Sequence, residues 1–140
     1  MAYTTGHVFS RLSLRQNNMA QDPRHGEQVT IIINKIEDGE EVATSTLVMS
    51  QVCGYLKWEK RPNVIPTFLA YLRSVPNLTK VDTTFMDFVQ AHELGIEHEI
   101  DWRLWDDLVI ATKMKRIEID EIYSNDADFD TIPGVQRVFE

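Results

Sequence analysis

The alternation of short strand-like segments with longer helix-like segments most constrains the fold of this chain. The longer segments carry apolar residues at helical spacing, as in the run of Val29, Ile32, Ile33 and Ile36. Such alternation is typical of a parallel sheet with helices on both faces, because each return to a parallel strand needs a crossover. The expected strands are 2–9, 41–44, 78–82, 121–124 and 135–139. The expected helices are 22–37, 46–58, 62–75, 84–94 and a last one that begins at 101.

Capping residues mark several of these boundaries. Ser45 or Thr46 is expected to cap the second helix, and Thr83 or Thr84 the fourth, because hydroxyl side chains accept from free backbone N–H groups at a helix start. Gly95 is expected to close the fourth helix, since glycine readily adopts the left-handed conformation that ends many helices.

Length and charge bound the class of protein. The 140 residues fit one domain, expected to span 1–140. The formal charge of -8 disfavours a protein that merely coats nucleic acid, but it is compatible with a nuclease whose carboxylates hold metal ions.

Cys53 is the single cysteine, so an internal disulfide is excluded, and it is expected to be a buried helical thiol. The sequence contains no apolar run of membrane-spanning length and no signal-peptide pattern, and a cytoplasmic location is expected.

Asp107 is the first carboxylate in an unusual position. It follows Leu104 by three residues and precedes Ala111 by four, so it borders the apolar stripe of the last expected helix. Asp106, by contrast, points nearer Lys113. A carboxylate at the margin of a core needs a partner or a cation. The alternative is an ordinary hydrogen-bonded helix residue.

Three acids occur within five residues directly after the strand expected at 121–124. They are Asp126, Asp128 and Asp130. In open α/β sheets, ligands gather at the carboxyl ends of the strands. These acids therefore either surround a hard cation such as Mg²⁺ or Mn²⁺, or form a turn rich in Asn and Asp that faces water.

Several sharper motifs are incomplete. An EF-hand starting at Asp126 would need Gly in place of Thr131, and an HExxH motif starting at His92 would need His in place of Ile96. The six glycines are scattered and form no phosphate loop. The histidines are expected at the surface, and the tryptophans in the core or at interfaces rather than under nucleobases. These residues are His7, His25, His92 and His98, and Trp58, Trp102 and Trp105.

Four segments in order resemble the landmarks of a PIN domain. They are DPRHG at 22–26, TSTLV at 44–48, WDDLVIA at 105–111 and IYSNDADFDTIPG at 122–134. The last segment is the most specific, and the resemblance extends over about 22–139. It is most similar to the small prokaryotic PIN proteins typified by VapC toxins. It implies an α/β, PIN-like three-layer sandwich with a central, mostly parallel sheet and helices on both faces.

The resemblance also implies a candidate active site. PIN domains are metal-dependent ribonucleases in which four acids bind one or two Mg²⁺ or Mn²⁺ ions, which activate water and stabilise charge on the scissile phosphate. The third acid corresponds to Asp107 and the fourth to Asp126, with Asp128 close by. The second position holds Gln51 and the first holds Thr5, neither of which brings a charge. One ion is therefore expected rather than two, because each lost carboxylate lowers affinity for a dication.

Two functions follow from this resemblance. The first is a Mg/Mn-dependent ribonuclease of the VapC toxin type, weakened by the two replaced acids, with Asp107, Asp126 and Asp128 as catalytic metal ligands. Ser124 and Asn125 would orient them. The second is a catalytically inactive PIN-fold protein that acts by binding RNA or an antitoxin protein. A homodimer is also expected, motivated by the family and by the apolar helices at 64–72 and 85–94.

Overall fold

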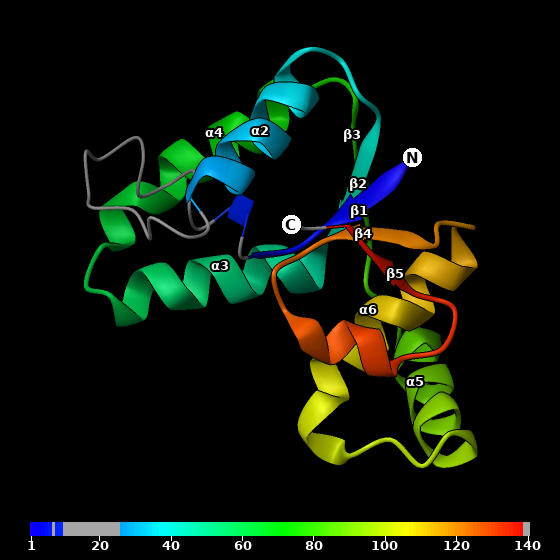
Figure 1. Ribbon diagram of the computed structural model, residues 1–140. Helices are drawn as coiled ribbons and strands as arrows, with labels where there is room; N and C mark the ends of the chain where they lie inside the picture. The colour runs from blue at the N-terminus through cyan, green and yellow to red at the C-terminus, as the bar shows by residue number, and fades with distance from the viewer. Residues whose placement is uncertain (7, 10–25, 139–140) are drawn as a thin grey trace.

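A five-stranded parallel sheet lies at the centre of the computed structural model, which describes residues 1–6, 8–9 and 26–138 (Figure 1). The strands lie in the order β3–β2–β1–β4–β5, and each pair of neighbours is parallel. The predicted parallel α/β class is therefore confirmed. In chain order the strands are β1 (Ala2–Thr4), β2 (Val42–Ser45), β3 (Leu78–Val81), β4 (Glu121–Tyr123) and β5 (Gln136–Arg137).

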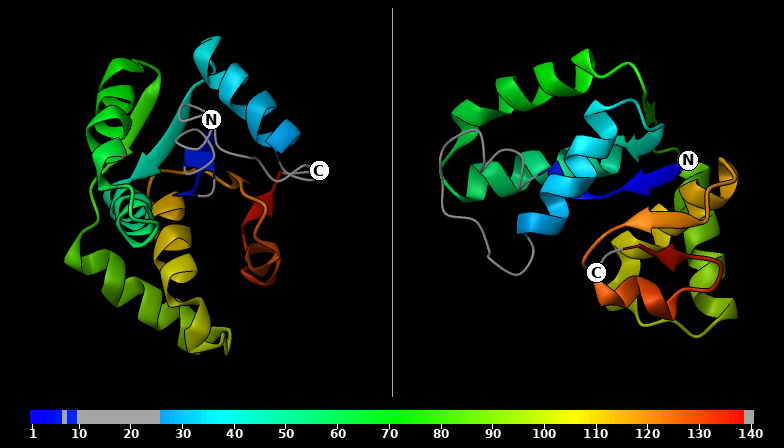
Figure 2. Two further views of the ribbon diagram at one scale, coloured as in Figure 1. Left: turned by 90° about the vertical axis from the view of Figure 1, so that its left-hand side faces the viewer. Right: turned by 45° about the horizontal axis from the view of Figure 1, so that its top comes forward.

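Helices cover both faces of this sheet. Figures 1 and 2 show α2 and α4 on one side and α5 and α6 on the other. This division follows from right-handed crossovers, because the chain moves along the sheet in one direction from β1 to β3 and then reverses to reach β4. The helices are α2 (Gly26–Glu37), α3 (Thr46–Trp58), α4 (Ile65–Ser74), α5 (Phe85–Glu97) and α6 (Trp105–Arg116), and the 3₁₀ segments are η1 (Pro62–Val64), η2 (Trp102–Leu104) and η3 (Ala127–Thr131).

The core lies where the predicted apolar stripes meet the central strands. Every residue of β1 and β2 is buried. The stripe of α2 that carries Val29, Ile32, Ile33 and Ile36 is buried along with them, as its helical spacing predicts. Ser45 caps α3 by accepting from the backbone N–H of Val48, one of the two caps expected there.

A smaller apolar cluster joins α5 to α6 through Ala91, Leu108 and Val109. Gly95 lies within α5, which continues to Glu97, so the prediction that this glycine closes the helix is wrong. A Cβ at Gly95 would lie 3.2 Å from Cδ1 of Leu108, tighter than ordinary van der Waals contact. The glycine therefore serves the close approach of the two helices rather than a turn.

The predicted first strand, 2–9, is wrong in its extent. β1 ends at Thr4, and Gly6, Val8 and Phe9 are helical. A Cβ at Gly6 would lie 3.2 Å from Cγ2 of Val52, so the chain turns against α3 at a point that leaves little room for a side chain. The expected helix start at 22–23, His7, His25 and residue 139 lie outside the described residues.

Within the described part of the chain, no helix combines the length and the apolar character needed to cross a membrane.

Candidate metal centre

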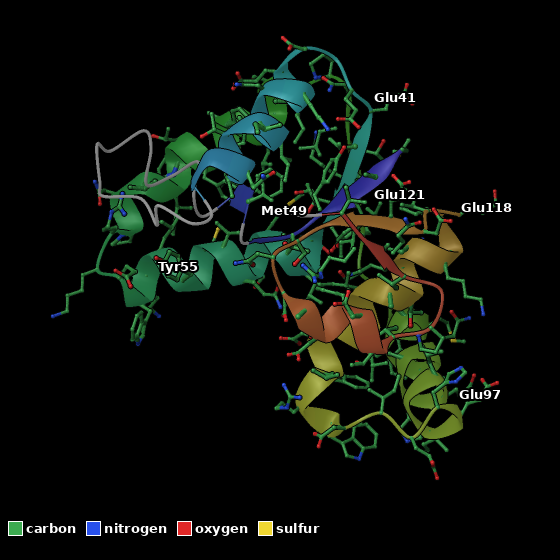
Figure 3. The ribbon with its side chains drawn as sticks, viewed as in Figure 1. Glu41, Met49, Tyr55, Glu97, Glu118 and Glu121 are labelled. Atoms are coloured by element: carbon green, nitrogen blue, oxygen red, sulfur yellow. The ribbon has the colours of Figure 1, made fainter. Side chains whose placement is uncertain are left out.

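Three aspartates from two distant segments converge at one edge of the sheet. Asp107 lies in the first turn of α6, and Asp126 and Asp128 follow β4, at or just inside the start of η3. One carboxylate oxygen of each residue lies within 4.8 Å of those of the other two. Among the described residues, most acids instead point outward from the surface, as Glu41, Glu97, Glu118 and Glu121 do in Figure 3.

Local hydrogen bonds hold the segment after β4. The Ser124 hydroxyl, which is buried, accepts from the backbone N–H of Asp126 at 3.1 Å. The Asp126 carboxylate in turn accepts from the backbone N–H of Asp128 at 2.9 Å and caps η3. The Asn- and Asp-rich turn that the sequence offered as an alternative to a cation site is therefore present, and it places the two carboxylates side by side.

A cavity of about 600 Å³ opens beside the aspartates. Its lining includes the predicted ligands Asp107 and Asp126 and also the two positions that lack acids, Thr5 directly after β1 and Gln51 on α3. Tyr55 lies one turn further along α3 on the same cavity (Figure 3). Thr5, Gln51, Ser124 and Asn125 all line this one cavity.

The environment of Asp107 disfavours its charged form. Burial is the largest cause, followed by the nearby carboxylates of Asp126, Asp128 and Asp106, and together they raise the pKa of Asp107 to about 7. Arg103 opposes the shift. A carboxyl that shares a half-buried space with like charges is stabilised by a cation placed between them.

Arg103 contacts this cluster, and it was not predicted. Its Nη1 donates to Oδ2 of Asp128 at 3.0 Å, and the arginine side chain remains 65% exposed. The only sequence signal is that Arg103 precedes Asp107 by one helical turn, a spacing at which side chains meet. It is the guanidinium, therefore, that partly neutralises the aspartates in this structure.

Gln51 and Asp106 form a second unpredicted contact. Nε2 of Gln51 donates to Oδ2 of Asp106 at 3.0 Å and links α3 to the start of α6. A glutamate at position 51 would place a second carboxylate next to Asp106, and the two like charges would repel unless a cation lay between them. The amide instead satisfies Asp106 without a metal.

The donor set suits one hard dication. Mg²⁺ and Mn²⁺ prefer carboxylate oxygens, and ligands on opposite sides of one Mg²⁺ lie roughly 4 Å apart at the usual bond length. One oxygen from each of the three aspartates lies within 4.8 Å of the other two, which is close to that span. Thr5 and Gln51 add oxygen atoms but no charge, so a second dication would lack anionic ligands on that side of the cavity.

Comparison with known proteins finds the same fold in toxin structures. No protein-family model matches the chain, and no curated protein does. The VapC20 toxin of Mycobacterium tuberculosis, described as cleaving the sarcin-ricin loop, superposes with a TM-score of 0.78 and 19% identity over 100% of both chains. A chain of the VapBC2 complex from Rickettsia felis, bound to a promoter DNA fragment, has a TM-score of 0.69 and 16% identity over 100% of both chains.

A third structure, a toxin–antitoxin complex from Klebsiella pneumoniae, has a TM-score of 0.61 and 15% identity over 97% of this chain and 96% of its own. The PIN-like fold inferred from the sequence motifs is therefore confirmed over the full length of the chain by structural similarity to VapC toxins.

Proposed function

We propose that this protein is a metal-dependent ribonuclease of the VapC toxin type that works with one Mg²⁺ or Mn²⁺ ion. The observation that supports it is the convergence of Asp107, Asp126 and Asp128 within 4.8 Å at the sheet edge of a VapC-like fold. A cation bound there would polarise a phosphodiester and lower the pKa of a water molecule.

The residues of this chain would have separate roles in that reaction. Asp107 reaches the site from the rigid first turn of α6, whereas Asp126 and Asp128 are oriented by the turn that Ser124 organises. Thr5 and Gln51 would line the space beside the scissile phosphate with neutral hydrogen-bonding groups. A site with two fewer negative charges than a complete set of four acids binds a metal ion more weakly. Such a site also repels an RNA backbone less.

The direct test is cleavage of labelled RNA by purified protein in Mg²⁺ or Mn²⁺. We expect cutting that stops in EDTA and is lost in Asp107→Asn, because that variant keeps the side-chain shape and removes one anionic ligand. Asp38→Asn, an exposed acid after α2, is the matched control and should cut like the parent protein. Cleavage that survives both EDTA and Asp107→Asn would contradict the proposal.

Restoring the missing acids tests the assignment of the two neutral positions. The double variant Thr5→Asp with Gln51→Glu should bind Mn²⁺ more tightly than the parent, because it adds two carboxylates to the cavity that already holds Asp107 and Asp126. Isothermal titration with Mn²⁺ measures the change. Unchanged affinity in a folded double variant would show that these positions do not face the cation.

A second function is supported by specific contacts. Arg103 already pairs with Asp128, and Gln51 already satisfies Asp106, so the site is partly neutralised without a metal. An inactive PIN-fold protein that binds an antitoxin or RNA would keep such contacts. It is favoured if the parent protein does not cut RNA and the double variant does.

A further inference from the structure

We propose that η2 forms a nucleotide subsite in which Trp102 stacks on an unpaired base and Arg103 binds the adjoining phosphate. This inference rests on the proposed function in its choice of RNA as the ligand. Trp102 and Arg103 are adjacent in the chain, and η2 leads directly into α6 and the aspartates. In Figure 1 this segment (yellow) lies beside η3 (orange to red), which carries Asp128.

The aromatic half of the subsite is an exposed tryptophan ring that contacts neighbouring rings at an angle. Trp102 is 59% exposed although it is a large apolar side chain. Its ring centroid lies 5.9 Å from that of Trp105 and 5.6 Å from that of His92. Trp105 in turn stacks on Phe88, with centroids 6.2 Å apart and planes inclined by 14°. The neighbouring rings hold Trp102 in place while leaving it open to a flat partner from solvent.

The cationic half is Arg103, whose guanidinium has donors to spare. The salt bridge to Asp128 uses one Nη1 contact, whereas a guanidinium carries five N–H donors. Asp101 fixes the backbone at this point by accepting from the N–H of Arg103 at 2.7 Å. An exposed guanidinium with free donors is well suited to bind a phosphate oxygen.

The exposed ring of Trp102 and the adjacent guanidinium of Arg103 together favour single-stranded RNA over a second copy of this chain as the occupant. Base stacking on an aromatic ring next to a cation that binds the backbone is the usual mode of single-strand recognition. The pair also adjoins the aspartates, so a nucleotide held there continues toward the proposed metal centre. Phe85 and Met86, exposed apolar residues at the start of α5, are flanked in the chain by Thr84 and Asp87 and not by a cationic residue.

Binding measured without cleavage tests this subsite independently of the nuclease proposal. A fluorescein-labelled single-stranded 12-nucleotide RNA is titrated with the protein in EDTA and followed by fluorescence anisotropy. Trp102→Ala should weaken binding by about tenfold, the loss typical of one base–aromatic stack, and Trp102→Phe should restore most of it. Arg103→Gln should weaken binding and reduce the dependence of log affinity on log salt by about one.

Matched controls are Trp58→Ala, an exposed tryptophan at the end of α3, and Arg73→Gln, an exposed arginine on α4. Both should bind RNA like the parent protein. The inference is overturned if the parent does not bind the RNA, or if Trp102→Ala and Trp58→Ala bind equally. It is also overturned if Trp102→Ala changes only the oligomeric state in sedimentation velocity, since the rings would then belong to a protein interface. A protein that binds RNA through Trp102 but does not cleave it would refute the nuclease proposal and leave this subsite intact.

Discussion

Lys113 is fully buried, and its ammonium group donates to Oγ1 of Thr83 at 2.8 Å. Thr83 Oγ1 also bonds Thr46, so the lysine joins α6 to the residues that follow β2 and β3. Burial is the main reason that the pKa of Lys113 falls to about 8. Asp87 and Asp106 favour its charge, and Arg116 opposes it.

This lysine predicts a dependence of stability on pH. Between about pH 8 and 10.4 the unfolded chain holds a proton on Lys113 that the folded chain has lost, so this group makes folding more favourable as the pH rises. The stability of the parent relative to Lys113→Met should therefore increase by on the order of 1–2 kcal/mol from pH 7 to pH 10. Urea denaturation at both pH values measures it. Lys115 is an exposed lysine on the same helix, so the stability of the parent relative to Lys115→Met should not change with pH in this way. An equal pH dependence for the two variants would contradict the low pKa assigned to Lys113.

The residues of the site differ in how far the sequence could predict them. Asp107 was identifiable because it borders an apolar stripe, and Asp126 and Asp128 because they follow a strand. Arg103 and the contact between Gln51 and Asp106 were not, because they are tertiary pairings of exposed polar groups. Periodicity and spacing carry no information on which exposed groups meet.

The start of α5 shows how a short motif can stabilise an element. Thr84 accepts from the N–H of Asp87 while the Asp87 carboxylate accepts from the N–H of Thr84, which forms a capping box. Burial alone would raise the pKa of Asp87. Hydrogen bonds from Arg116 and Thr84 outweigh it, and the pKa of Asp87 lies below its usual value.

Removing this cap should destabilise the fold. Thr84→Ala is expected to lower the free energy of unfolding by about 1 kcal/mol, because the first turn of α5 then loses the hydroxyl that accepts from the N–H of Asp87, whereas Thr84→Ser should keep most of that stability. Thermal or chemical denaturation of the three proteins gives the comparison. Equal losses for alanine and serine would show that packing of the threonine methyl group, not capping, matters.

Helices were easier to predict than strand ends for a physical reason. The stripe of α2 and the caps of α3 and α5 are local signals, so the sequence defines them closely. The end of β1 at Thr4 and the continuation of α5 through Gly95 instead depend on how closely α3 and α6 approach the chain. Such approaches become visible only when distant segments are placed together.

At the scale of the whole molecule, an exposed apolar patch supports the expected homodimer. Phe85 is 78% exposed and Met86 54% exposed at the start of α5, within one of the two apolar helices expected to mediate contact. Large side chains gathered in this way are typical of protein interfaces. We expect the protein to be a dimer at micromolar concentration in light scattering, and Phe85→Asp to be a monomer. Ile96→Asp, an exposed position near the other end of the same helix, is the control. A parent protein that is already monomeric would refute the expectation.

The central place of β1 has a consequence for how the protein is made. The ribosome delivers β1 before the other strands of the sheet, yet one of its two partners is β4, where Tyr3 pairs with Ile122, more than a hundred residues later. Until β4 has been translated, one side of β1 presents unpaired backbone N–H and C=O groups. Such groups can form incorrect strand pairs with other nascent chains. Completion of the sheet must therefore wait until β4 has been translated, and a prematurely terminated product lacking β4 should be captured by chaperones or precipitate rather than persist as a folded fragment.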